Sequence, residues 1–134
     1  MRLWPLCIID QLPRQQLLGQ HRECCALRGK GCGRKHSTVD YVFCHPYEHL
    51  ALYHRHILLE MVDRGYCPNE KWWDSTYRGK NLPSCRISQR VLWDAPDLVY
   101  PEHDENYLDE CIANLARKGV TIDRKRAIER LNAS

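Results

Sequence analysis

The chain has 134 residues, with 20 Lys and Arg against 17 Asp and Glu and a net charge of +3. This length fits one domain, and an apolar fraction of 43% is too high for an intrinsically disordered chain. No apolar stretch approaches the roughly 20 residues that cross a bilayer, so we expect no membrane-spanning segment and no membrane partner.

Helical patterning begins near Pro13, a residue suited to the first turn of a helix. It continues to Arg28, where Gly29 is expected to stop the helix. At 100° per residue, one side of this helix is predicted to face the core; it consists of Leu17, Leu18, His21, Cys24 and Cys25. The opposite side consists of Gln16, Gly19, Gln20, Glu23 and Ala26.

A second helix is predicted from about Pro46 to Arg64, with an apolar face of Leu50, Ala51, Ile57, Leu58, Met61 and Val62. A third begins near His103 and ends at Gly119, with acids in its first turn and bases in its last, as the helix dipole favours. Its apolar stripe consists of Tyr107, Leu108, Cys111, Ile112 and Leu115. A short fourth helix is expected after Asp123, where Ala127, Ile128 and Leu131 supply the apolar side.

Residues 66–100 are long, aromatic and irregular, and no strand alternation appears in the chain. We therefore predict an all-α fold that forms one compact domain over residues 1–134. It has three main helices, a short C-terminal helix and a long irregular segment. Aromatic side chains among cations can stack on nucleic-acid bases, but most of the tryptophans are expected to anchor that segment to the core.

The eight cysteines form no CxxC pair and have no zinc-finger spacing. The apolar run at the N-terminus is too short for a signal peptide. These observations predict reduced, mostly buried thiols in a cytoplasmic protein. The alternative is a secreted domain with four disulfides.

The positive charge is concentrated at the N-terminus, because residues 1–36 carry seven basic residues and two acids. The seven are Arg2, Arg14, Arg22, Arg28, Lys30, Arg34 and Lys35. A concentrated basic end is typical of a phosphate-binding face, and an ordinary solvated surface explains it equally well.

The outward side of the first predicted helix carries an interior glycine, which costs about 1 kcal/mol relative to alanine. Close approach of another molecule to Gly19 would offset this cost, and Glu23 lies about one turn further on. The alternative is that Glu23 is an ordinary exposed acid and that Gly19 packs against the N-terminal segment of the same chain.

The segment Gln16-Leu17-Leu18-Gly19-Gln20-His21-Arg22-Glu23 resembles the first-helix motif of the pyrimidine-dimer DNA glycosylases, the phage-type endonuclease V family. Three later segments are similar to family segments in the same order: Arg34-Lys35-His36, Arg64-Gly65-Tyr66 and Tyr77-Arg78-Gly79-Lys80. The similarity covers roughly residues 1–83. It implies a compact all-α enzyme that acts on damaged double-stranded DNA without a cofactor or metal.

The resemblance implies a glycosylase that also has AP lyase activity. The N-terminal amine, here that of Met1, would attack C1′ of the damaged nucleotide, and Glu23 would be the catalytic carboxylate. The candidate DNA-binding residues are Arg2, Gln16, Gln20, Arg22, Arg28, Arg34, Lys35, His36, Arg78 and Lys80. The protein is expected to act as a monomer.

The chain also departs from the family pattern. Arg2 follows Met1, so the initiator methionine is expected to remain, whereas the phage enzymes expose a threonine amine. Ala26 stands where the family has an arginine, and the C-terminus lacks the aromatic, basic tail. A second hypothesis is therefore a non-catalytic nucleic-acid-binding or interaction module with the same fold.

The second predicted helix is rich in histidine. His45, His49 and His56 lie on one side of it, near Glu60, and histidines four residues apart can bind zinc. A polar helix face explains them better, so a metal-dependent hydrolase is the least favoured hypothesis. His54 lies in the apolar stripe and is predicted to be a hydrogen-bonded core histidine.

Overall fold

The computed structural model describes residues 2–30, 39–80 and 82–133, with only the backbone described for Lys30 and Asp40. Within these ranges the regular structure is helical and contains no strand, which confirms the all-α prediction. The α-helices are α1 (Arg14–Lys30), α2 (Tyr47–Asp63), α3 (Gln89–Asp94), α4 (Glu105–Arg117) and α5 (Arg124–Asn132). Three short 3₁₀ helices are η1 (Leu6–Gln11), η2 (Asp40–Cys44) and η3 (Glu70–Trp73). None of the described helices combines the length and apolar character needed to cross a bilayer.

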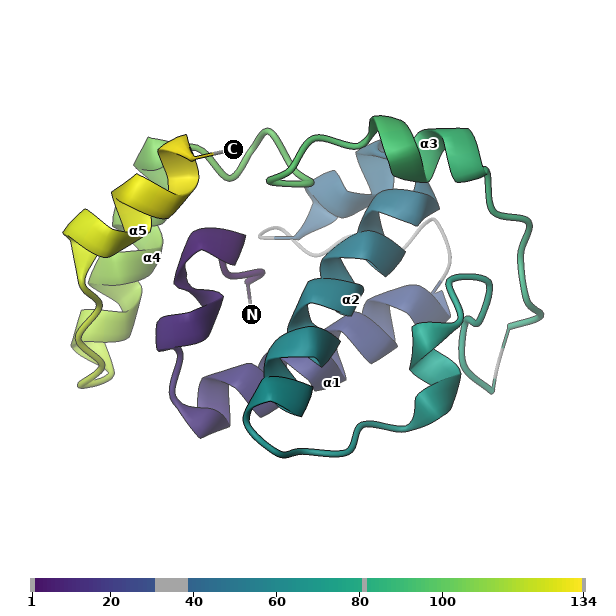
Figure 1. Cartoon of the computed structure of the whole chain (residues 1–134), viewed down its shortest axis with the longest axis horizontal. Helices are drawn as coiled ribbons and strands as arrows, with labels where there is room; N and C mark the ends of the chain where they lie inside the picture. The colour runs from purple at the N-terminus through teal and green to yellow at the C-terminus, as the bar shows by residue number, and fades with distance from the viewer. Residues whose placement is uncertain (1, 31–38, 81, 134) are drawn as a thin grey trace.

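The centre of the fold is the pair α1 and α2, which pack side by side (Figure 1). Helices α4 and α5 form a second pair at one end of the molecule, and η1 packs against both α2 and α5. The buried cluster draws residues from all of these elements, including Leu3, Ile8, Leu17, Ile57, Leu108 and Leu115. Because Leu3 and Trp4 are buried, the N-terminal segment is part of the core.

Short polar side chains begin the C-terminal helices as the sequence indicates. The Asp104 carboxylate accepts a hydrogen bond from the Tyr107 amide at the start of α4, and Asp123 accepts one from Arg126 at the start of α5. Gly65 has a φ of +88° and follows α2, which agrees with the predicted stop. The expected stop at Gly29 is wrong, because α1 continues through it to Lys30.

The long segment after α2 is more ordered than predicted, since it contains η3 and α3. Trp72 and Trp73 are partly buried and pack against the core, as does the buried Trp4. Anchoring of most tryptophans is therefore confirmed. Trp93 is the exception, because its side chain is 84% exposed.

The predicted faces of α1 and α2 need correction. Leu17 and Cys24 are fully buried as expected, but Gln20 and Arg28 are buried as well. The N-terminal segment lies against Gln20, and the segment after α2 lies against Arg28. Apolar periodicity reports neither contact. On α2, Val62 is 49% exposed.

The seven cysteines in the described ranges are free thiols. Cys7, Cys24 and Cys111 are buried, whereas Cys44 and Cys67 are exposed. The expectation of mostly buried thiols is therefore wrong for part of this set. Cys32 lies outside the described residues.

Candidate nucleic-acid interface

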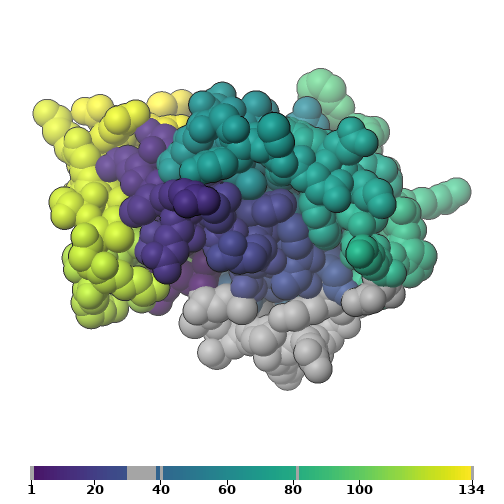
Figure 2. All heavy atoms as spheres, turned by 90° about the horizontal axis from the view of Figure 1, so that it is seen from below, coloured from purple at the N-terminus to yellow at the C-terminus, as the bar shows by residue number. Residues whose placement is uncertain are grey.

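A pocket of about 320 Å³ lies between the N-terminal segment, α1 and α4. Its lining includes the predicted site residues Arg2, Gln16, Gln20, Arg22 and Glu23, together with Trp4, Gln15, Gly19, Asn114 and Lys118. We call it the α1 pocket. Figure 2 shows α1 at the surface between the N-terminal segment and the C-terminal helices on one side and the segment that follows α2 on the other.

The α1 pocket is suited to an anionic ligand. Arg2, Arg22 and Lys118 contribute three cations to its lining, against the single carboxylate of Glu23. Glu23 is partly buried, so its charge acts in a medium less screened than bulk water. The pocket therefore combines a phosphate-attracting rim with one acid.

Gly19 lies in the wall of this pocket. An added Cβ at Gly19 would meet Arg22 Nη2 at 3.8 Å, and apart from the neighbouring backbone of α1 itself no other atom of the described residues would lie within 4 Å. Within the described residues, the N-terminal segment therefore makes no contact at the position of this Cβ.

Gly19→Ala is expected to increase the stability of the protein while it weakens DNA binding or turnover. Alanine should raise the free energy of unfolding by about 0.5–1 kcal/mol, while its Cβ narrows the pocket and lowers DNA affinity or turnover about tenfold. Urea unfolding and DNA-binding titrations measure the two effects.

Gln20 is a structural residue, which corrects its assignment as a DNA contact. Its side chain is 3% exposed. Oε1 accepts a 2.7 Å hydrogen bond from the Trp4 amide, and Nε2 donates to Arg2 O at 3.3 Å. Because these bonds occupy the amide group, Gln20 holds the N-terminal segment and does not read a DNA gap.

Arg28 is also corrected, because its side chain is completely buried. Its guanidinium donates to the carbonyls of Trp72, Asp74 and Tyr77 at 2.8–3.0 Å. It also donates to Tyr47 Oη at 2.8 Å and to His54 Nδ1 at 3.0 Å. These contacts match the five donors of a guanidinium, so Arg28 ties the segment after α2 to α1 and leaves no donor for a phosphate.

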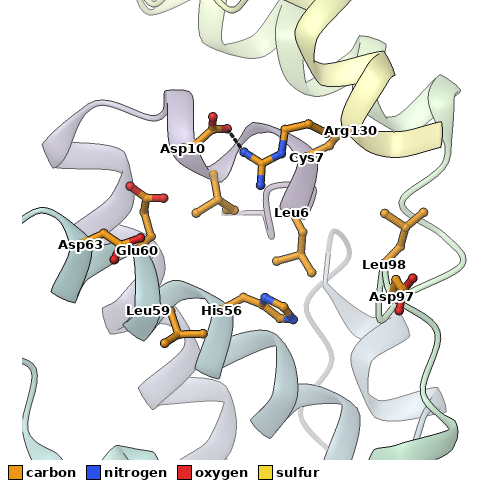
Figure 3. A pocket seen from close by; sticks show the side chains of 11 residues that line it. Leu6, Cys7, Asp10, His56, Leu59, Glu60, Asp63, Asp97, Leu98 and Arg130 are labelled. Carbon is orange, nitrogen blue, oxygen red and sulfur yellow. Dashed lines mark ion pairs between the residues drawn. The ribbon is translucent and has the colours of Figure 1, made fainter. Parts of the chain in front are cut away.

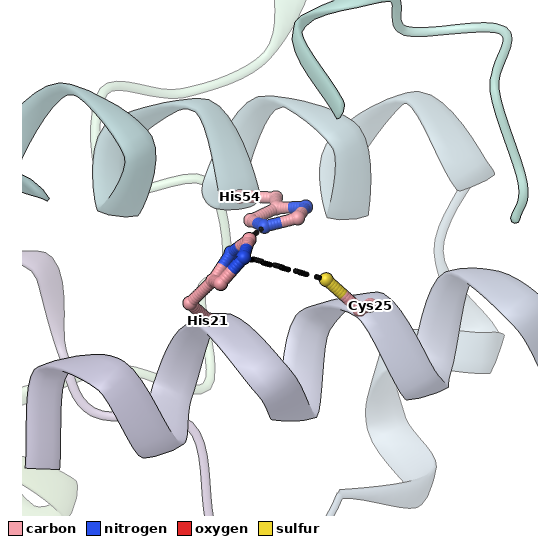
Figure 4. Close-up of side chains that lie close together, drawn as sticks. All are labelled: His21, Cys25 and His54. Atoms are coloured by element: carbon pink, nitrogen blue, oxygen red, sulfur yellow. Dashed lines mark hydrogen bonds between the residues drawn. The ribbon is translucent and has the colours of Figure 1, made fainter. Parts of the chain in front are cut away.

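The contact with Arg28 determines which ring nitrogen of His54 carries hydrogen. Figure 4 shows His54 with its neighbours His21 and Cys25. A guanidinium cannot accept, so His54 Nδ1 is the acceptor and its ring hydrogen lies on Nε2. His54 Nε2 is 2.9 Å from His21 Nδ1, and His21 lies 3.8 Å from Cys25 Sγ. Burial, together with Arg28, lowers the pKa of His54 to about 2. The prediction of a hydrogen-bonded core histidine is confirmed.

His21, Cys25 and His54 offer ligand atoms within 4.8 Å of one another. Their types suit zinc, but a cation on His54 Nε2 would have to replace the hydrogen that Nε2 donates to His21. It would also lie close to the fixed charge of Arg28, and burial raises the pKa of the Cys25 thiol to about 11. The arrangement fits three neutral side chains better than a metal site.

The three histidines that were predicted to share one side of the second helix do not form one cluster. His45 precedes α2, contacts Glu102 at 2.9 Å and has its ring centroid 5.8 Å from that of His49. His56 lines a separate pocket of about 270 Å³ (Figure 3). That pocket contains Asp10, which pairs with Arg130 at 2.6 Å. It also contains three further acids, Glu60, Asp63 and Asp97. This acidic lining is unsuited to nucleic acid.

Arg78 and Lys80 line another pocket, of about 370 Å³, with Cys25, Ala26, Gly29, Trp72 and Gly79. Arg78 Nε donates to Arg28 O at 3.0 Å, and its guanidinium lies 4.3 Å from the centre of the Tyr47 ring. Lys80 is exposed. These two predicted DNA contacts therefore lie together beside the C-terminal part of α1, and not in the α1 pocket.

The family model for pyrimidine dimer DNA glycosylases matches residues 1–74, which is more than half of the chain. The chain belongs to the pyrimidine dimer DNA glycosylase family. Members of this family are enzymes of DNA repair. No curated protein and no solved structure gives a significant match.

The family match covers the first-helix motif, with Glu23, and ends before the Tyr77–Lys80 segment. Met1, Arg34, Lys35 and His36 fall within the match but lie outside the described residues.

Sequence reasoning missed two residues of the α1 pocket, Asn114 and Lys118. They are one turn apart on or just after α4, beyond the family match. Asn114 Oδ1 is buried and has no hydrogen-bond partner among the described residues, and Lys118 Nζ lies 5.7 Å from the centre of the Trp4 ring. No local pattern links them to α1, because their place in the pocket depends on how α4 packs.

Proposed function

We propose that the protein is a DNA glycosylase with AP lyase activity that acts on pyrimidine dimers or a related lesion in duplex DNA. The α-amine of Met1 is the proposed nucleophile, and Glu23 is the proposed catalytic carboxylate. Family membership supports the substrate class. The observation that carries the proposal is that Arg2, from the N-terminal segment, and Glu23, from α1, line the same pocket.

Covalent geometry links the proposed nucleophile to this pocket. Consecutive Cα atoms are about 3.8 Å apart, so the residue before Arg2 is attached directly to the pocket lining. An α-amine has a pKa of about 7.7–8.0, against about 10.4 for lysine. About a tenth of such an amine is therefore neutral at pH 7, which makes it a usable nucleophile without deep burial.

In the proposed reaction the amine nitrogen bonds to C1′ while the bond from C1′ to the damaged base breaks, and the base leaves with the electron pair. Opening of the sugar ring gives a Schiff base. Removal of a C2′ proton then expels the 3′ phosphate by β-elimination. The Glu23 carboxylate stabilises the positive charge that develops at the sugar and helps to move the protons.

The remaining pocket residues would hold the DNA strand. Arg2, Arg22 and Lys118 are placed to contact phosphates, which sets the position of the DNA without reading its sequence. Gln16 lies at the pocket without the backbone contacts of Gln20 and is the better candidate to fill the gap left by a flipped nucleotide. Arg78 and Lys80 lie further along α1 and would contact the neighbouring part of the duplex.

Borohydride trapping tests the proposal. The protein with an untagged N-terminus, identified by intact mass, is incubated with a duplex that contains an abasic site or ultraviolet-induced dimers. We expect a covalent complex that is lost after selective acetylation of the α-amine. An acetylated control should still bind the duplex, because its side-chain cations are unchanged.

Two other outcomes would contradict the proposal. A salt-sensitive complex that borohydride never traps would identify a non-catalytic DNA-binding module. Trapping that survives acetylation of the α-amine would move the nucleophile to a lysine side chain.

A further inference from the structure

The N-terminal segment is held by side chains from three different helices. Gln20 of α1 contacts both Arg2 O and the Trp4 amide, as described above. Tyr53 of α2 donates to Trp4 O at 2.5 Å, and Tyr107 of α4 donates to Leu3 O at 2.7 Å. We call Gln20, Tyr53 and Tyr107 the N-terminal clamp.

The clamp is unusual for a chain terminus. The first residues of most domains are poorly ordered unless something holds them. Here the carbonyls of residues 2, 3 and 4 and the amide of residue 4 all accept or donate a hydrogen bond within the described structure. Gln20 and Tyr53 are themselves buried, and burying polar groups is unfavourable unless they are bonded. Their polar groups are therefore directed at the backbone of the N-terminal segment.

The N-terminal clamp holds the chain close to the α1 pocket, and this can affect the rate of the proposed reaction. Arg2 and Glu23 line the same pocket, and the carbonyl of Arg2 accepts a hydrogen bond from Gln20. The carbonyl of Arg2 that accepts this hydrogen bond is separated from the proposed nucleophile, the α-amine of Met1, only by the backbone of these two residues. Holding a reactant in position raises the rate of its reaction, because little freedom remains to be lost on reaching the transition state.

We propose that Gln20, Tyr53 and Tyr107 are positioning residues, which hold the backbone of residues 2–4 at the α1 pocket and so restrict the part of the chain that carries the reactive N-terminal amine. This inference rests on the proposed function of that amine. The clamp residues do not touch the substrate. They act by restricting the backbone of residues 2–4, so their loss lowers the rate of Schiff-base formation without weakening the binding of DNA.

Tyr107→Phe is the most informative variant. It removes the bond to Leu3 O but keeps the ring, which stacks on His103 with a centroid distance of 4.8 Å. The control is Tyr100→Phe, which makes the same chemical change. Tyr100 is fully buried, whereas Tyr107 is partly buried, and the Tyr100 hydroxyl has no hydrogen-bond partner among the described residues. The two variants differ in whether the lost hydroxyl holds the N-terminal segment.

The experiment measures the rate of borohydride trapping at saturating abasic duplex, the dissociation constant of the duplex, and hydrogen exchange of the Trp4 amide. For Tyr107→Phe we expect trapping to slow about tenfold, faster exchange at Trp4, and a dissociation constant within twofold of wild type. Tyr100→Phe should match wild type in all three.

Unchanged trapping in Tyr107→Phe would overturn the clamp proposal, and so would equal slowing in both variants, which would indicate a general effect of packing. If wild-type protein forms no Schiff base, the proposed function fails and the positioning role fails with it. If wild type traps DNA but its Trp4 amide exchanges freely, the function stands and the clamp is rejected.

Discussion

Glu23→Gln is expected to lower base release and Schiff-base trapping at least 100-fold while leaving the affinity for damaged duplex within about threefold. The amide keeps the size of the side chain but can neither carry the negative charge that stabilises a cationic sugar nor accept a proton. Single-turnover kinetics on a dimer-containing duplex measure the rate, and binding titrations measure the affinity. Removing one acid from a pocket with three cations should not weaken the attraction for phosphate.

Glu110→Gln is the matched control for this experiment. It is the same chemical change in an exposed acid that lies 3.9 Å from Arg2, and it should leave turnover nearly unchanged. If Glu23→Gln turns over at the wild-type rate, Glu23 has no catalytic role. If turnover slows to the same extent in both variants, the loss of negative charge near Arg2 explains the effect, and the Glu23 carboxylate has no special role.

Arg28→Met is expected to reduce the free energy of unfolding by about 3–5 kcal/mol. Methionine fills part of the volume but donates none of the five hydrogen bonds. Trp72 O and His54 Nδ1 lose the donor that Arg28 supplies, and each unsatisfied buried group costs about 1–3 kcal/mol. The carbonyls of Asp74 and Tyr77 keep hydrogen bonds from Tyr77 N and Tyr47 Oη. Urea unfolding with linear extrapolation measures the loss.

Arg22→Met provides the contrast on the same helix. Arg22 is exposed and lines the α1 pocket, so its loss should change stability by no more than about 0.5 kcal/mol. It should weaken DNA binding and reduce the salt dependence of that binding by roughly one phosphate contact. A stable Arg28→Met protein with reduced salt dependence would restore Arg28 as a phosphate contact and contradict its structural role.

Much of the helical architecture could be predicted from local signals. The long helices appear within a few residues of their expected ends, because proline, acidic N-caps and Gly65 act on the neighbouring backbone. The short helix α3 was missed, since six residues are too few for apolar periodicity to be recognised.

The sequence by itself determined the all-α class, the basic N-terminal end and the motif that carries Glu23, because helix patterning, charge and motif spacing are local properties. Which polar residues line the α1 pocket and which support the fold depends on the tertiary structure. Arg28 and Gln20 resemble surface residues in sequence, but their hydrogen-bond partners come close to them only when the chain folds. The carbonyls that Arg28 contacts, for example, follow it in the sequence by 44 to 49 positions. The same packing brings Lys118 and Asn114 to the α1 pocket, since contacts between distant segments depend on how helices pack and not on the order of neighbouring residues.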